Sequence, residues 1–158
     1  KGRTLPGFMG DIGYAQSNRE RYEGFCQALM DAGKTPNPSL CLTTPLGIDS
    51  YREEIDSFLS SLSRMPDAFV CASDYVACIL MQLLEKRGLR VPEDVAVSGF
   101  DNNIEDLLAE NLTTVQVFNE ELGSRLALQI LYRIKYPHTP HEVTYLESKV
   151  LYRASTGD

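Results

Sequence analysis

The feature that most constrains the fold is a regular alternation of short apolar runs with longer amphipathic segments. The apolar runs predict strands near residues 4–9, 40–44, 68–71, 95–100 and 113–117. The amphipathic segments predict helices near residues 18–32, 49–64, 74–87 and 120–136. Strands separated by helices of this length need crossover connections, which favour parallel neighbours. We therefore predict an α/β fold, a doubly wound and mainly parallel sheet with helices on both faces.

Two local signals refine this prediction near the start of the chain. The first predicted helix ends before Gly33, a residue type that commonly terminates helices. Its inner face is expected to carry Tyr22, Phe25, Cys26, Leu29 and Met30. In the first predicted strand, Pro6 lacks a backbone N–H, so we expect it near a strand end or on a sheet edge.

Composition narrows the function classes. The net charge of −7 opposes contact with phosphates, so these 158 residues are not expected to bind nucleic acid by themselves. No apolar run approaches the roughly 20 residues that a membrane-spanning helix needs. The 4 cysteines show no Cys-x-x-Cys spacing, which favours buried, reduced thiols in a cytosolic protein over a zinc site or a redox pair.

Polar side chains follow three of the predicted strands. Arg21 lies in the helix after the first strand, Ser73 and Asp74 follow the third, and Asp101 follows the fourth. In a doubly wound sheet the carboxyl ends of neighbouring strands converge on one crevice, where such folds bind ligands. The sequence thus predicts a small-molecule cleft with charged side chains in its lining.

Several stretches of sequence carry a family resemblance. They are SNRERYEGF (17–25), CASDYVA (71–77), GLRVPEDVAVSGFDN (88–102), LTTV (112–115), ELG (121–123) and RAST (153–156). In this order and spacing they resemble the effector-binding domain of the lactose-repressor/galactose-repressor (LacI/GalR) family of bacterial transcription regulators. The resemblance covers nearly the whole chain and implies a periplasmic-binding-protein-like fold.

The resemblance implies a cytoplasmic, homodimeric sensor whose two subdomains close on a small effector, such as a sugar or related polyol. Residues 1–112 would form the C-terminal effector-binding subdomain. Residues 113–140 would cross into an N-terminal subdomain that this chain lacks, and residues 141–158 would return. Operator DNA would be contacted only through a missing N-terminal module, of helix-turn-helix or winged-helix type. A sugar-binding component of a transport system, which shares the fold, is the alternative function.

The resemblance also identifies ligand contacts, each with a structural alternative. Arg21 could be an exposed helix residue and Asp101 a turn former, but for both we favour ligand contact, because two opposite charges at strand ends would otherwise need another partner. A guanidinium fork and a carboxylate suit adjacent hydroxyls. Ser73 or Asp74 could contact ligand or cap a helix, and for Asp74 we favour the cap. Phe118 could stack on a sugar face, although packing in the core or hinge is favoured.

Other chemistry is weakly supported. His138 and His141 are three residues apart in a Pro-containing stretch, which we interpret as a loop rather than a metal site. Asp101, Glu105 and Asp106 could form an acid–base pair, but the last two have the pattern of a solvated turn. No nucleophile elbow, phosphate loop or dinucleotide fingerprint occurs, so we expect neither an enzyme nor a cofactor.

The predicted helix at 120–136 has a wide apolar stripe that the rest of this chain is not expected to cover. Its members are Leu122, Leu126, Ala127, Ile130, Leu131 and Ile134. Large side chains left in water forfeit about 1.5–3 kcal/mol each relative to full burial. We therefore expect the helix either to pack against a second copy of the chain, which is favoured, or to fold back over its own sheet.

Overall fold

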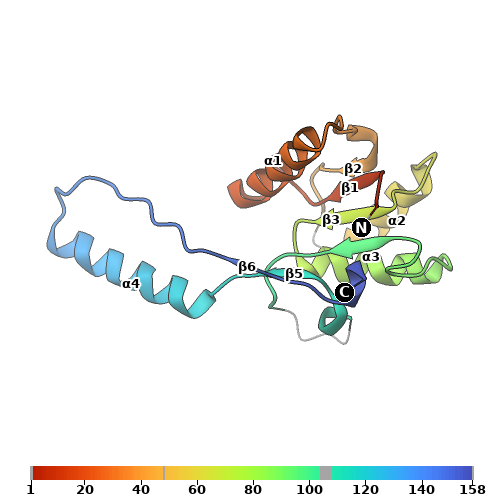
Figure 1. Ribbon diagram of the computed structural model, residues 1–158. Helices are drawn as coiled ribbons and strands as arrows, with labels where there is room; N and C mark the ends of the chain where they lie inside the picture. Colours follow the sequence, from red (N-terminus) through yellow and green to blue (C-terminus); the bar gives the residue numbers. More distant parts are fainter. Residues whose placement is uncertain (1, 48, 104–107, 158) are drawn as a thin grey trace.

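The computed structural model describes residues 2–47, 49–103 and 108–157 (Figure 1). The helices are α1 (Gln16–Asp31), α2 (Tyr51–Ser61), α3 (Asp74–Lys86) and α4 (Asn119–Lys135). The strands are β1 (Pro6–Met9), β2 (Cys41–Leu42), β3 (Ala68–Cys71), β4 (Ala96–Ser98), β5 (Thr114–Gln116) and β6 (Lys149–Leu151). Three short 3-10 turns are Pro38–Leu40, Ala109–Asn111 and Ala154–Thr156.

The first four strands form a parallel sheet in the order β2-β1-β3-β4. Pro6 is the first residue of β1, an interior strand, which agrees with its expected place at a strand end. β5 starts beside β4 through a parallel bridge between Ser98 and Thr113 and then pairs with β6 in the antiparallel sense. The predicted α/β doubly wound fold is confirmed.

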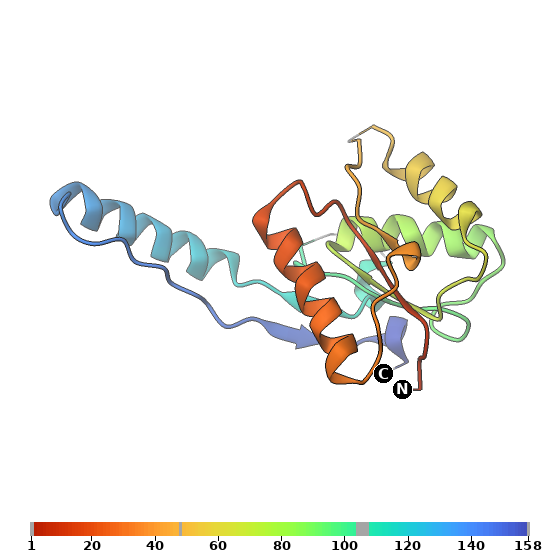
Figure 2. The ribbon, with the colours of Figure 1, turned by 90° about the horizontal axis from the view of Figure 1, so that it is seen from above.

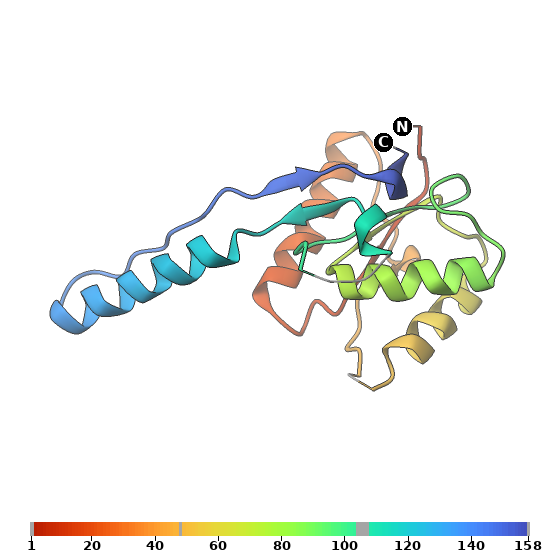
Figure 3. The ribbon, with the colours of Figure 1, turned by 90° about the horizontal axis from the view of Figure 1, so that it is seen from below.

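Helices cover the two faces of the parallel sheet unequally. Seen from above, α1 lies in front of the strands (Figure 2), and from below α2 and α3 do (Figure 3). The larger core lies on the side of α2 and α3, where Ile55, Leu80 and Leu84 pack against the sheet. A smaller core on the α1 side is built around Phe8 and Phe25.

α1 shows why one predicted core residue is exposed. Phe25 is buried on Phe8 with ring centroids 5.7 Å apart, and Tyr22 packs on Phe8 at 5.1 Å. Met30, however, is 51% exposed, so its assignment to the inner face is wrong. At about 100° per residue Met30 lies about 80° around the helix from Tyr22, on the flank of the buried stripe. The helix ends as predicted, because Gly33 has φ +70° and Lys34 N donates to Leu29 O at 2.8 Å.

Beside α1 the sheet is hollowed by a largely apolar groove of about 520 Å³. Its lining comes mostly from β3, β4, β5 and β6, and includes Ala96, Val115, Val150 and Tyr152. Arg21 and Phe100 also line it. The α1 face of the sheet is therefore only partly covered by the described residues.

β5, α4 and β6 form an arm that projects away from the body (Figure 1). α4 has no buried residue, and Leu126, Leu131 and Ile134 are 60%, 62% and 72% exposed. The expectation that this helix folds back over its own sheet is wrong, because the strand before it carries the chain beyond the sheet. Its apolar surface remains uncovered among the described residues.

The cysteines are free thiols, as predicted, but not all are buried. Cys71 and Cys78 are buried, whereas Cys26 and Cys41 are half-buried between α1 and β2. Burial raises the pKa of Cys71 and Cys41, which keeps both thiols protonated at neutral pH.

Two methionines test the assigned core. Met9 is fully buried at the end of β1, so Met9→Ala should lower the free energy of unfolding by about 2–5 kcal/mol. The matched control Met30→Ala removes the same atoms from an exposed position and should change it by no more than about 0.5 kcal/mol. Urea denaturation measures both, and equal losses would contradict the assigned burial.

Candidate ligand-binding site

Arg21 and Asp101 come together at the carboxyl-terminal edge of the sheet. Arg21 lies in α1 after β1, and Asp101 follows β4. Arg21 Nη2 lies 3.3 Å from Asp101 Oδ1, forming an ion pair between residues 80 positions apart. Strand order reverses between β1 and β3, and doubly wound folds bind ligands at such a switch point. The structure therefore joins two predicted site residues at the place where the topology favours a ligand.

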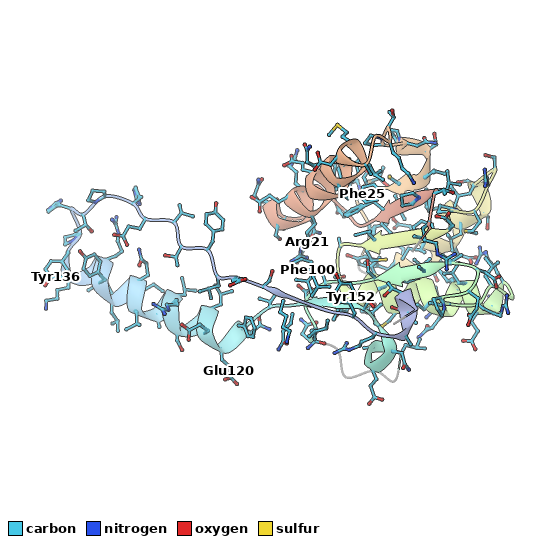
Figure 4. The ribbon with its side chains drawn as sticks, in the orientation of Figure 1. Arg21, Phe25, Phe100, Glu120, Tyr136 and Tyr152 are labelled. Carbon is cyan, nitrogen blue, oxygen red and sulfur yellow. The ribbon has the colours of Figure 1, made fainter. Side chains whose placement is uncertain are left out.

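Several contacts fix the Arg21 guanidinium. Nη1 donates to the carbonyl oxygen of Ala72 at 2.5 Å and to Asn18 Oδ1 at 3.4 Å. The guanidinium carbon also lies 3.6 Å from the centroid of the Phe100 ring, in a cation–π contact. Figure 4 shows Arg21 and Phe100 side by side beneath α1. The planar charge is thus pre-oriented between the loops that follow β1, β3 and β4.

The charges of Arg21 and Asp101 compensate each other only in part. The side chains of Arg21 and Asp101 are 20% and 27% exposed. Burial lowers the pKa of Arg21 and raises the pKa of Asp101, and in each case the attraction of the partner offsets burial only in part. One long hydrogen bond joins the two groups, and Asp101 Oδ2 accepts none from the described residues. Ligand hydroxyls could complete the shell of both charges.

The helix cap expected at Asp74 is supplied by Ser73. Ser73 is the N-cap of α3, and its Oγ accepts a hydrogen bond from Val76 N at 3.3 Å. Asp74 is therefore not the cap that the sequence favoured. It lies in the first helical turn and is only 2% exposed. Because Asp74 follows a Ser that caps the helix, its carboxylate is available for other partners.

Asp74 instead binds the loop after β4 and the start of β5. Oδ1 accepts from Thr114 Oγ1 at 2.6 Å, and Oδ2 accepts from Asn102 N at 2.7 Å. Burial raises the pKa of Asp74, although these hydrogen bonds act in the opposite direction. Gly99 permits the approach, because a side chain there would overlap Asp74 Oδ1 and Leu112. The sequence alone gave no sign of this anchor except the glycine.

Phe118 follows Val117, whose backbone N–H donates to the Asp101 carbonyl at 3.5 Å. It lies at the N-terminal end of α4, is 44% exposed, and has no aromatic contact with another described residue. Its assignment to core packing is wrong because it is not buried. A role in the hinge or against a ligand stays a prediction.

Sequence reasoning missed a group of tyrosines at the same edge of the sheet. Tyr14 follows β1 and is 77% exposed, and Tyr75, in the first turn of α3 after β3, is 53% exposed. Tyr51 packs edge-on against Tyr75 with ring centroids 5.5 Å apart. Their position just beyond strand ends was the sequence signal that could have identified them as candidate site residues.

Two groups named in the sequence analysis remain, the histidine pair and the acid–base group. His138 and His141 are exposed in the loop after α4, and no group of three metal-ligating side chains occurs in residues 2–47, 49–103 and 108–157. Glu105 and Asp106 lie outside the described residues, so the acid–base suggestion is not examined by the structure. In the described part of the chain no helix combines the length and apolarity needed to cross a bilayer.

This sheet topology is compatible with a periplasmic-binding-protein-like fold, and the comparisons with known proteins show that the chain has that fold. The chain belongs to the periplasmic binding protein-like domain family, whose model matches residues 1–156. Its relatives and structural neighbours are LacI-family regulators, as the sequence resemblance predicted.

Three comparisons illustrate the relationship. The transcriptional repressor PurR of Photobacterium profundum is 28% identical over 141 residues, which is 89% of this chain and 42% of that protein. A LacI-family regulator from Sanguibacter keddieii is 28% identical with a TM-score of 0.83, covering 99% of this chain and 60% of that one. The transcriptional regulator CelR, solved with cellobiose, is 27% identical with a TM-score of 0.84, covering 98% and 47%. The chain thus spans less than half of PurR and of CelR.

Ser73 allows the capping role to be tested. Ser73→Ala removes the acceptor for Val76 N and should lower the free energy of unfolding by about 1 kcal/mol. Ser73→Thr retains a hydroxyl at the same position and should lose less. Urea denaturation of the two variants measures this difference, and an alanine variant as stable as the parent would show that the cap contributes nothing.

Proposed function

We propose that this chain is the ligand-sensing part of a bacterial transcriptional regulator and that Arg21 and Asp101 bind a sugar or related polyol. The observation that carries the proposal is the incompletely compensated ion pair at the switch point of the sheet. Relatives named as transcriptional repressors support the regulatory role.

The ligand class follows from the chemistry of this edge. A guanidinium offers several donors in a fixed plane and a carboxylate offers only acceptors, so together they suit neighbouring hydroxyl groups. The exposed rings of Tyr14 and Tyr75 supply apolar faces on which a sugar ring can pack. The cellobiose complex of CelR supports the same class.

The division of the chain is part of the proposal. Residues 1–112 form the C-terminal effector subdomain, 113–140 belong with a second subdomain, and 141–158 return. The projecting arm and the uncovered surface of α4 support this division. Operator DNA is contacted outside these residues, as the net charge of −7 suggests, and the protein acts in the cytoplasm. Effector binding then favours one arrangement of the two subdomains over another.

Substitution of the ion pair tests the site. Arg21→Ala and Asp101→Ala should each weaken effector binding by about 2–5 kcal/mol, because each removes one charged partner from the ligand. Arg19→Ala is the matched control, since Arg19 lies on the same helix but is exposed.

The measurement begins with a thermal-shift panel of sugars that includes cellobiose. Calorimetry on the three variants then uses the sugar that stabilises the parent protein most. Unchanged affinity in both site variants would refute the assignment of this pair. A parent protein stabilised by no sugar in the panel would refute the proposed ligand class.

The exposed stripe of α4 generates a prediction about assembly. We expect residues 1–158 to form a homodimer through this stripe, because contiguous apolar surface usually marks an interface. Ile130→Glu should shift the chain to monomer in analytical ultracentrifugation, since it places a charge near the centre of the stripe. Ser124→Glu adds the same charge to the same helix, about 120° around it from Ile130, and should leave the dimer intact. A strictly monomeric parent chain would contradict the prediction.

A further inference from the structure

The backbone at Asp101 is held in an unusual conformation. Asp101 has φ 110° and Asn102 has φ 51°, and they are the residues other than glycine with positive φ in the described chain. Such conformations are costly for side-chain-bearing residues and persist only where surrounding contacts enforce them. The strain coincides with the carboxylate that faces Arg21.

Asn102 is held from two sides. Its backbone N–H donates to Asp74 Oδ2 at 2.7 Å, and its side-chain Oδ1 accepts from Arg153 Nη2 at 2.8 Å. The first partner comes from the start of α3 and the second from the segment after β6. Because the two partners belong to different parts of the chain, Asn102 cannot rotate without breaking at least one bond.

Both of these partners are themselves anchored. Asp74 is almost fully buried and also accepts from Thr114 Oγ1 at 2.6 Å. Arg153 Nη1 donates to the carbonyl oxygens of Ala109 and Leu112 at 3.1 and 3.0 Å. The backbone N–H of Asn103 also hydrogen-bonds to the Asp74 carboxylate.

The backbone of Asp101 completes the arrangement. Its N–H donates to the Val115 carbonyl at 2.9 Å, and its carbonyl accepts from Val117 N at 3.5 Å. With its main chain bound to the β5 segment and its neighbour clamped, only the Asp101 side chain remains to be oriented. It points to Arg21.

We propose that Asp74 and Arg153 are positioning residues that clamp Asn102 and thereby hold the Asp101 carboxylate in its ligand-binding orientation. This inference rests on the proposed function for its ligand, but not for its geometry. It assigns Asp74 an indirect role in place of the direct ligand contact that the resemblance implied. It also gives Arg153, a residue distant in sequence from the site, a part in affinity.

Three variants and one control separate positioning from general stability. Asp74→Ala removes two acceptors, and Asn102→Gly removes the oxygen that Arg153 binds while tolerating positive φ. Asp74→Asn is the conservative variant, because its oxygen can accept from Asn102 N while its amide donates to Thr114 Oγ1. Leu84→Ala, at the far end of the same helix, destabilises the core without touching the clamp.

The first measurement is amide hydrogen exchange without ligand. Exchange at Asp101 N–H, relative to core amides, should accelerate on the order of tenfold in Asp74→Ala and Asn102→Gly, because a lost hydrogen bond releases the loop. Asp74→Asn and Leu84→Ala should keep the parent ratio. Unchanged protection of Asp101 in Asn102→Gly, which should fold in any case, would overturn the proposal whether or not any sugar binds.

The second measurement is the affinity for cellobiose as probe. Asp74→Ala and Asn102→Gly should bind about ten- to hundredfold more weakly, the loss seen when partners that orient metal-binding carboxylates are removed. Asp74→Asn and Leu84→Ala should bind as the parent does, and an equal loss in Leu84→Ala would overturn the positioning role. A parent that binds no cellobiose while the exchange results hold would count against that ligand alone and leave the clamp supported.

Discussion

The reversal of strand order between β1 and β3 governs where every other part of the domain lies. The chain leaves β1 through α1 to β2 and then passes back across β1 through α2 to β3. Because such crossovers are right-handed, α1 and α2 must cover opposite faces of the sheet. The loops after β1 and β3 therefore diverge, and Arg21 reaches across them to the Ala72 carbonyl. The place of the site is a consequence of topology rather than of a local motif.

The Arg21–Asp101 ion pair differs from the pair that Arg90 forms with Asp94. Arg90 and Asp94 make two short contacts, Nε to Oδ2 at 2.9 Å and Nη2 to Oδ1 at 3.0 Å. Hydrogen bonds from Arg90 lower the pKa of Asp94 to about 2, as expected for an exposed and well-formed pair. Asp101 shows the opposite shift, because burial outweighs its single long bond to Arg21. For a half-buried pair of this kind, the free-energy cost of removing the two charges from water exceeds the gain from their single long hydrogen bond.

The pattern of apolar residues was sufficient to predict the fold but not the burial of every residue in a helix. Alternating strands and helices, with Gly33 closing α1, predicted the parallel sheet because burial and chain direction leave few alternatives. Met30 was misplaced because a stripe read from the sequence does not show how far a sheet extends around a helix.

The candidate site was predictable only in part. The convergence of Arg21 and Asp101 followed from their places after strands, whereas the choice of Ser73 rather than Asp74 as the N-cap depends on which oxygen faces Val76 N. A one-residue difference of that kind is decided by backbone geometry, which the sequence pattern does not contain. Arg153 lies in the segment that returns after α4, 51 positions from its partner Asn102. Their contact therefore could not be predicted from closeness in the sequence.

The loop after β4, which contains Asp101 and Asn102, shares hydrogen bonds with the arm formed by β5, α4 and β6. Asp101 N–H bonds the carbonyl of Val115 in β5, and Thr114 bonds Asp74, which in turn holds Asn102. Any change in the loop that alters these bonds must also act on the strand that leads into α4. A ligand can shift the equilibrium between two arrangements of a protein only by as much as its binding free energy differs between those two arrangements. Because the same bonds orient Asp101 and anchor β5, that difference can arise where the arm leaves the domain, without a separate relay through the core.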